Sequence, residues 1–134
     1  MAKNKIEDSL KQAIHALKIA EDEINRPNED VVTLSVCLTA RQSMRAMMRL
    51  FLLTKSIHHD ESESLYNLLS HCKKADKQFE SIELSKMVCN KLDAAGCENK
   101  YCLAIPNVND CMEIANKIKL LMMNKLQFTE SEIE

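Results

Sequence analysis

The stretch from Val31 to Leu53 constrains the fold more than any other part of the chain, because 15 of its 23 residues are apolar. A helix with apolar residues on most of its circumference cannot lie on a surface with one side in water, so it must run through the middle of a helical domain. Met44, Met47 and Met48 add flexible side chains, which suit an adaptable core or a partner surface. We therefore predict a central helix that neighbouring helices cover on several sides.

Three arginines recur every four residues within this stretch, so Arg41, Arg45 and Arg49 should form one narrow row along the helix. Each would cost roughly 2.5–3.5 kcal/mol at the centre of a membrane span, and we therefore expect no membrane association here. Guanidinium groups bind phosphate through two hydrogen bonds, and a row of them could meet RNA, a nucleotide or an acidic partner. The alternative is that they pair within the chain. The carboxylates considered for such pairing are Glu21, Asp22 and Glu23.

The composition indicates one helical domain. The chain has 134 residues, enough to bury roughly two-thirds of its extended surface in a single core. It contains one glycine, Gly96, and two prolines, Pro27 and Pro106, and so lacks the turn residues of a many-stranded fold. The formal net charge of −2 favours neither nucleic acid nor an anionic membrane. The charged N-terminal segment lacks the apolar run of a secretory signal, so we expect a cytoplasmic protein.

The spacing of apolar residues predicts the helices in order. Positions three and four residues apart predict a first helix from Ile6 to Ile24, which ends before Pro27 because proline cannot continue the hydrogen-bond ladder. After the central helix, Asp60 and Glu63 have the spacing of a capping box, and they predict the start of a short third helix.

The second half of the chain is less regular. A fourth helix with an uneven apolar stripe is predicted from Phe79 to about Gly96, followed by a long loop from Cys97 to Val108. Asp110 and Glu113 repeat the capping-box spacing and predict the start of the last helix. The expected fold class is all-α: an up-and-down helical bundle of four long helices and one short helix. It would form one domain over residues 1–134, with residues 129–134 as a flexible tail.

Histidines and cysteines are the remaining candidates for chemistry. His58 and His59 precede the third helix and could contact a ligand, although paired histidines in an exposed loop are usually solvated. The spacing of the cysteines does not match a structural zinc site, and without a secretory signal we expect reduced thiols. The six cysteines are Cys37, Cys72, Cys89, Cys97, Cys102 and Cys111. We expect no bound metal and no cofactor, with a cysteine-based metal-binding sensor as an alternative.

The order of these segments resembles the HEPN family, helical domains named for "higher eukaryotes and prokaryotes nucleotide-binding". The resemblance covers most of the chain. It rests on an amphipathic first helix, the run Ala40–Ala46 (ARQSMRA) in the second, the pair Leu68-Leu69, and a proline-containing loop before the helix that begins at Asp110.

Ribonuclease members of that family carry an arginine that is followed, four to six residues later, by a histidine near the start of the last helix. This chain has no arginine or histidine after His71, so it lacks that motif. The resemblance therefore implies the fold, a homodimer and a non-catalytic binding or assembly role. The implied partners are a nucleotidyltransferase-like protein, RNA or a nucleotide. The alternative is a divergent RNA-cleaving or nucleotide-handling enzyme that uses other residues.

Overall fold

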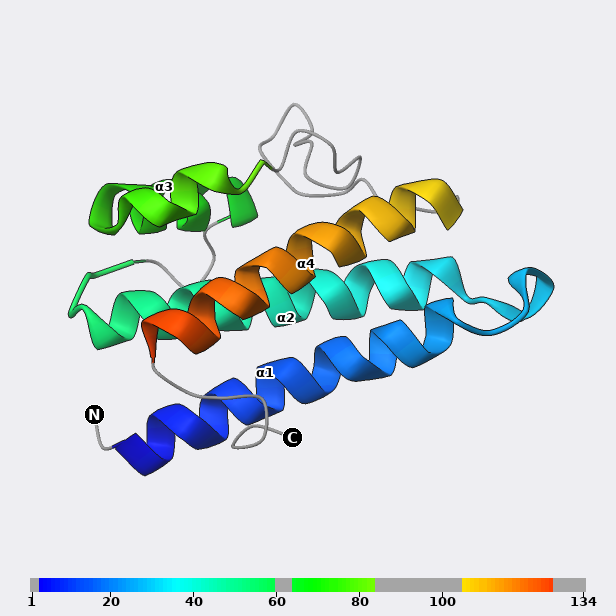
Figure 1. Cartoon of the computed structure of the whole chain (residues 1–134), viewed down its shortest axis with the longest axis horizontal. Coiled ribbons are helices and arrows are strands. Elements are labelled where there is room, and N and C mark those ends of the chain that lie inside the picture. The colour runs from blue at the N-terminus through cyan, green and yellow to red at the C-terminus, as the bar shows by residue number, and fades with distance from the viewer. Residues whose placement is uncertain (1–2, 60–63, 84–104, 127–134) are drawn as a thin grey trace.

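The structure is a computed structural model, and it describes residues 3–59, 64–83 and 105–126. All regular elements in these ranges are helices, which confirms the all-α prediction (Figure 1). The elements in chain order are α1 (Lys3–Ile24), η1 (Asn28–Asp30), α2 (Thr33–Thr54), α3 (Leu65–Ala75), η2 (Lys77–Ser81) and α4 (Ile105–Lys125). The described part thus holds three long α-helices and one short one, where the sequence had indicated four long helices and one short.

The first helix forms as predicted. Leu10, Ala13, Ile14 and Leu17 are buried, and α1 extends to Ile24. The chain then turns into α2 through η1, in which the backbone N–H of Asp30 donates to the carbonyl of Pro27 at 2.8 Å.

One carboxylate holds this turn together. Glu23 accepts a hydrogen bond from the backbone N–H of Val32 at 3.0 Å, and the same oxygen lies 3.1 Å from an Arg26 nitrogen. Glu23, one of the three carboxylates that could have paired with the arginine row, therefore stabilises the connection between α1 and α2.

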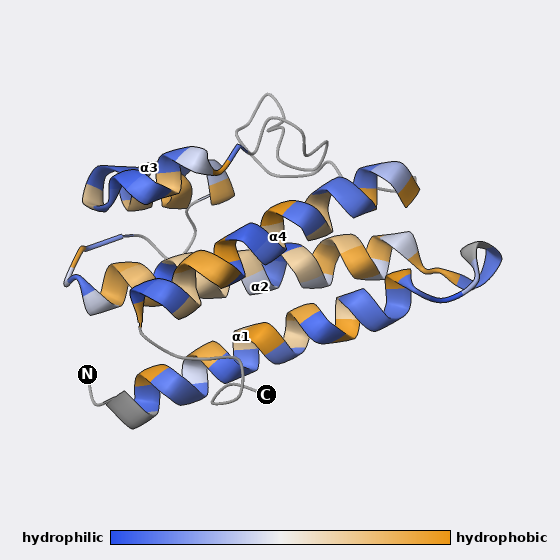
Figure 2. Cartoon of the chain, in the orientation of Figure 1, coloured by the Kyte–Doolittle hydropathy of each residue, from blue (hydrophilic) through white to orange (hydrophobic). Residues whose placement is uncertain are grey.

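Helix α2 is the central helix that the sequence predicted. It contacts α1, α3 and α4, and Figure 1 shows it lying behind α4 with α1 on one side and α3 on the other. Met44, Met47, Met48 and Phe51 are fully buried. The hydropathy colouring in Figure 2 shows apolar residues spread around α2, whereas α1 is apolar mainly along one stripe. Burial from three sides is what the apolar circumference requires.

Helix α3 begins at Leu65 and not at Asp60. Its N-cap is Ser64, whose Oγ accepts a hydrogen bond from the backbone N–H of Asn67 at 3.1 Å. The predicted capping residues Asp60 and Glu63 lie outside the described residues. The predicted stripe itself is confirmed. Its members Leu65, Leu68, Leu69 and Cys72 are all buried.

The fourth helix predicted from Phe79 starts differently. Phe79 belongs to the short 3-10 helix η2, which ends at Ser81, while the predicted continuation through Met87 and Leu92 lies outside the described residues. Phe79 is fully buried, and its ring centroid lies 4.7 Å from that of Phe51. This aromatic pair packs η2 against α2.

The last helix begins earlier than the sequence predicts. Helix α4 starts at Ile105, so Pro106 lies in its first turn, where a missing N–H costs no intrahelical hydrogen bond. Asp110 and Glu113 lie within the helix and do not form the predicted cap, and Glu113 instead pairs with Lys117 at 3.8 Å. The predicted loop is therefore wrong from residue 105 onwards.

The burial along α4 follows the predicted stripe. Cys111, Ile114, Ala115, Ile118 and Met122 are buried against the rest of the core. At the end of the helix, the Lys125 Nζ lies 2.7 Å from the Asp76 Oδ2, so an ion pair connects α4 to the segment between α3 and η2. Among the described helices, none is long and apolar enough to span a membrane.

Candidate functional site

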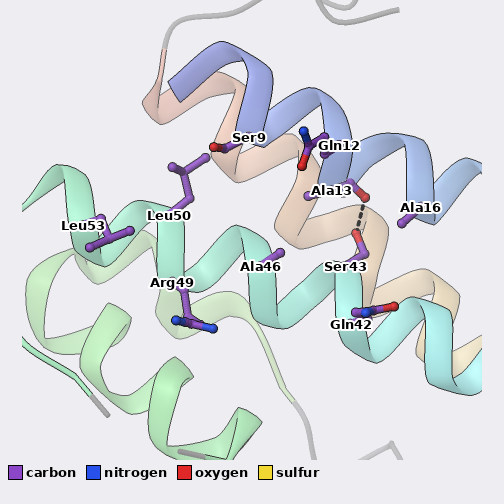
Figure 3. Close-up of a pocket in the computed structure, with 10 residues that line it drawn as sticks. All are labelled: Ser9, Gln12, Ala13, Ala16, Gln42, Ser43, Ala46, Arg49, Leu50 and Leu53. Carbon is purple, nitrogen blue, oxygen red and sulfur yellow. Dashed lines mark hydrogen bonds between the residues drawn. The ribbon is translucent and has the colours of Figure 1, made fainter. Parts of the chain in front are cut away.

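A groove with a volume of about 470 Å³ lies between α1 and α2 (Figure 3). Uncharged side chains line most of it, and Arg49 is the one charged residue among the lining residues. The lining residues are Ser9, Gln12, Ala13 and Ala16 from α1, with Gln42, Ser43, Ala46, Arg49, Leu50 and Leu53 from α2. A volume in this range is typical of ligand or partner pockets.

The two helices approach closely at the floor of this groove. Ser43 is buried, and its Oγ donates a hydrogen bond of 2.6 Å to the carbonyl oxygen of Ala13, drawn as the dashed line in Figure 3. A serine and an alanine leave little side-chain volume between the helices, so a direct contact from side chain to backbone becomes feasible. The groove therefore has a rigid floor, because both helices are fixed to each other at this point.

Exposed apolar side chains continue the surface beyond the groove. Leu38 is 46% exposed and Leu53 is 52% exposed, and Ile19 on α1 is exposed as well. Together they define what we call the α1–α2 face. Its residues are Gln12, Ala16 and Ile19 of α1, with Leu38, Gln42, Ala46 and Leu53 of α2. The spacings 38, 42, 46 and 53 place the α2 members on one side of that helix, and the same spacing places Arg49 on that side as well.

The arginine row differs along its length in its access to solvent. Arg41 is only 8% exposed, while Arg45 and Arg49 are half-buried. The Nε atoms of Arg41 and Arg49 are buried, and each of the three arginines takes part in an interaction within the protein. Arg49 extends from the side of α2 that faces away from α1 (Figure 3). Arg45 and Arg49 therefore have more access to solvent than Arg41 does, and a ligand-binding role of the row stays a prediction.

The two candidate histidines lie in the segment after α2. His58 is exposed, and His59 is half-buried with its Nδ1 atom 3.3 Å from the carbonyl oxygen of Ile57. Neither histidine lines the α1–α2 groove. Of the predicted site residues, Arg49 alone is among those that line this groove.

Thiol chemistry has little support in the described ranges. Cys37, Cys72 and Cys111 are buried and are not part of a disulfide, and the other three cysteines lie outside the described residues. Burial raises the pKa of Cys72 to about 12, because a thiolate would lose its hydration in the core. Residues 3–59, 64–83 and 105–126 contain no cluster of three or more histidine, cysteine or acidic side chains that could hold a metal ion.

Sequence reasoning missed the groove itself. The signal was present as small residues on one flank of each helix, Ala13 and Ala16 on α1 and Ser43 and Ala46 on α2. Small residues in a helix usually indicate nothing more than packing, and only the pairing of α1 with α2 brings these four together.

Comparisons with known protein families, curated proteins and solved structures gave no match for this chain.

Proposed function

We propose that this protein is a non-catalytic helical binding and assembly module that works as a homodimer, with the α1–α2 face as its interface. The observation that carries the proposal is a groove in which Arg49 is the one charged lining residue, flanked on α2 by the exposed Leu38 and Leu53, on a protein in which 28% of residues are charged. Interface centres are depleted in charged residues, because a charge that loses its water must find a partner.

The α1–α2 face is suited to pairing with a second copy of itself. Leu38 and Leu53 are 15 residues apart and therefore about 22 Å apart along the helix axis. Ala46 lies about midway between them. If a two-fold axis passes near Ala46, the two copies of α2 run antiparallel. Leu38 of each copy then lies opposite Leu53 of the other copy. The small side chain of Ala46 would let the two helices approach closely at the axis.

The size of the face also fits a dimer. Helices α1 and α2 have 22 residues each, so each is about 33 Å long at 1.5 Å per residue. Two helices side by side are about 18 Å wide, since helices pack at 8–10 Å between axes. The flat footprint is therefore about 600 Å², and the accessible surface is larger because side chains project from it. A typical stable interface buries about 800 Å² on each partner, which is within reach.

The non-catalytic part of the proposal rests on the residues. The full sequence has four arginines, none followed by histidine at the interval that HEPN ribonucleases use, so the resemblance supports binding more than RNA cleavage. Pairing with a nucleotidyltransferase-like protein, or with RNA or a nucleotide, is part of the same proposal. A homodimer would supply such a partner with two identical surfaces.

Light scattering on the purified protein tests the proposal. At tens of micromolar we expect a dimer, and we expect Ala46→Arg to give a monomer with unchanged helical content, because Ala46 is exposed and an arginine there blocks close approach at the axis. Leu53→Glu should also give a monomer. The matched control is Ala75→Arg, which makes the same change at an exposed site on α3 and should leave the dimer intact.

Two results would contradict the proposal in different ways. A monomeric parent protein at this concentration would remove the homodimer altogether. A dimer that survives both Ala46→Arg and Leu53→Glu would show that the two copies meet through another surface.

A further inference from the structure

A second groove, with a volume of about 290 Å³, lies between α1 and α4 on a different flank of α1 from the α1–α2 face. Most of its lining residues carry polar or charged side chains. Lys18, His15, Glu21 and Asp22 come from α1, while Lys119 and Asn116 come from α4. None of these six residues lines the α1–α2 groove, and the inference that follows is independent of the proposed dimer.

The charges in this groove do not pair with one another. Glu21 is three residues and Asp22 four residues from Lys18, the spacings at which helical ion pairs form. Within the described ranges, however, Lys18, Lys119, Glu21 and Asp22 form no ion pair. Lys119 is also half-buried, so part of its side chain packs against the helix surface beside the groove. The groove thus offers positive and negative groups that are not engaged with each other.

The arrangement has a defined polarity along α1. Lys18 and Asp22 are one turn apart, about 6 Å along the axis at 1.5 Å per residue. A lysine ammonium is a common ligand for phosphate, and carboxylates bind ammonium groups. A molecule that fits both must carry an anion and a cation separated by about one helical turn.

We propose that the α1–α4 groove binds a small phosphorylated amine. Its phosphate would lie beside Lys18 and Lys119, and its ammonium group beside Asp22 and Glu21. The amide of Asn116 and the ring of His15 supply further hydrogen-bonding groups at the groove wall. O-phosphoethanolamine is the simplest probe with this chemistry, because two carbons and one oxygen separate its phosphorus from its nitrogen.

Titration of the isotope-labelled protein by NMR tests this assignment. Millimolar O-phosphoethanolamine should give saturable shifts of the His15 ring resonances and of the backbone amides of Lys18, Asp22 and Lys119. Inorganic phosphate and ethanolamine, each added alone, carry only one of the two charges. Each should therefore bind at least several-fold more weakly.

Two variants separate the two ends of the groove. Lys18→Gln should weaken binding of both O-phosphoethanolamine and inorganic phosphate by up to about fivefold, the upper range for one exposed ion pair. Asp22→Asn should weaken O-phosphoethanolamine alone and should not weaken inorganic phosphate, because it removes a negative charge near the phosphate end. Lys74→Gln changes an exposed lysine on α3 and is the matched control, with no effect expected on either.

Several outcomes would overturn the assignment. These are shifts that never saturate, inorganic phosphate bound as tightly as O-phosphoethanolamine, or a loss of affinity in Lys74→Gln equal to that in Lys18→Gln. The first would indicate no site, the second a site for a simple anion, and the third a general effect of surface charge. Circular dichroism of each variant confirms that its helices are intact.

Discussion

Ser43 of α2 donates a hydrogen bond of 2.6 Å to the backbone carbonyl of Ala13, thirty residues earlier in α1. The contact is buried and lies at the floor of the α1–α2 groove. It connects the central helix to its neighbour directly beneath the face that we propose as the dimer interface. This hydrogen bond therefore helps to fix the two helices, and the groove between them, in place.

Ser43→Ala should lower the free energy of unfolding by about 1 kcal/mol, the usual net value of one such hydrogen bond. Ser43→Leu should cost more, about 1–3 kcal/mol, because the larger side chain must force the two helices apart. Denaturant melts of both variants check this, with the exposed Ser9→Ala as control. If Ser43→Leu is no less stable than Ser43→Ala, the two helices are not in close contact at this position.

The pair of Phe51 and Phe79 should be the main support of η2. Phe79→Ala should destabilise the protein by about 3–5 kcal/mol, because the ring is fully buried and its removal leaves a cavity. Phe79→Leu keeps most of the apolar area and loses the ring pair, so its cost should be clearly smaller. Thermal melts of the two variants measure the difference. Equal losses would mean that contact between the rings adds nothing to burial.

The arginine row should respond unequally to truncation. Arg41→Ala should cost about 3 kcal/mol, because this side chain is almost wholly buried and its interactions inside the protein would be lost. Arg45→Ala should cost less, since Arg45 is half-buried. Melts of the two variants give these values. Truncation of Arg45 or Arg49 that leaves stability unchanged but weakens RNA binding, with a shallower dependence on salt, would support the binding role instead.

The ion pair of Asp76 with Lys125 should make the protein less stable as the pH falls into the acid range. The hydrogen bond from Lys125, and next that from the backbone N–H of Gln78, lower the pKa of Asp76 below its ordinary 3.8. The unfolded chain therefore binds a proton at a higher pH than the folded one. The stabilisation that this carboxylate gives the folded protein is complete above pH 3.8. It is lost as the pH falls through the lower pKa of the folded state.

Asp76→Asn should therefore melt at a lower temperature than the parent protein near neutral pH, with the gap closing in acid. Asp22→Asn, at a carboxylate with no ion pair in the described part of the chain, is the control and should show no such gap. A gap that stays constant in acid would assign the effect to geometry and not to charge.

Cys72 should make the protein less stable at alkaline pH, whereas Asp76 affects its stability at acid pH. Its pKa is raised to about 12 by burial, and its thiol lies 3.8 Å from the Met48 carbonyl oxygen. Because the unfolded thiol ionises at lower pH than the folded one, the free energy of unfolding falls as the pH rises above about 9. Cys72→Ser should reduce this alkaline slope, measured by melts across that range. A thiol reagent that labels Cys72 as fast in the native protein as in denaturant would contradict its burial.

The helices that carry a regular apolar stripe could be predicted from sequence, because burial of one face imposes the three- and four-residue spacing. This holds for Leu10 to Leu17 in α1, for Leu65 to Cys72 in α3 and for Cys111 to Met122 in α4. The apolar circumference of α2 likewise determined its central place. The sequence determined the ends of the helices less well. Two sequence signals compete for the start of α4: the capping-box spacing at Asp110, and Pro106, which the first turn of a helix tolerates. In the structure α4 starts at Ile105.

The candidate site depended on tertiary structure. The row of three arginines follows from their spacing, yet burial of Arg41 depends on how neighbouring elements cover α2. The groove requires Ala13 and Ala16 of one helix to lie beside Ser43 and Ala46 of another, and no local pattern records that pairing. Periodicity determines which face of a helix is buried, whereas a site between helices depends on which faces meet, and long-range packing alone decides that.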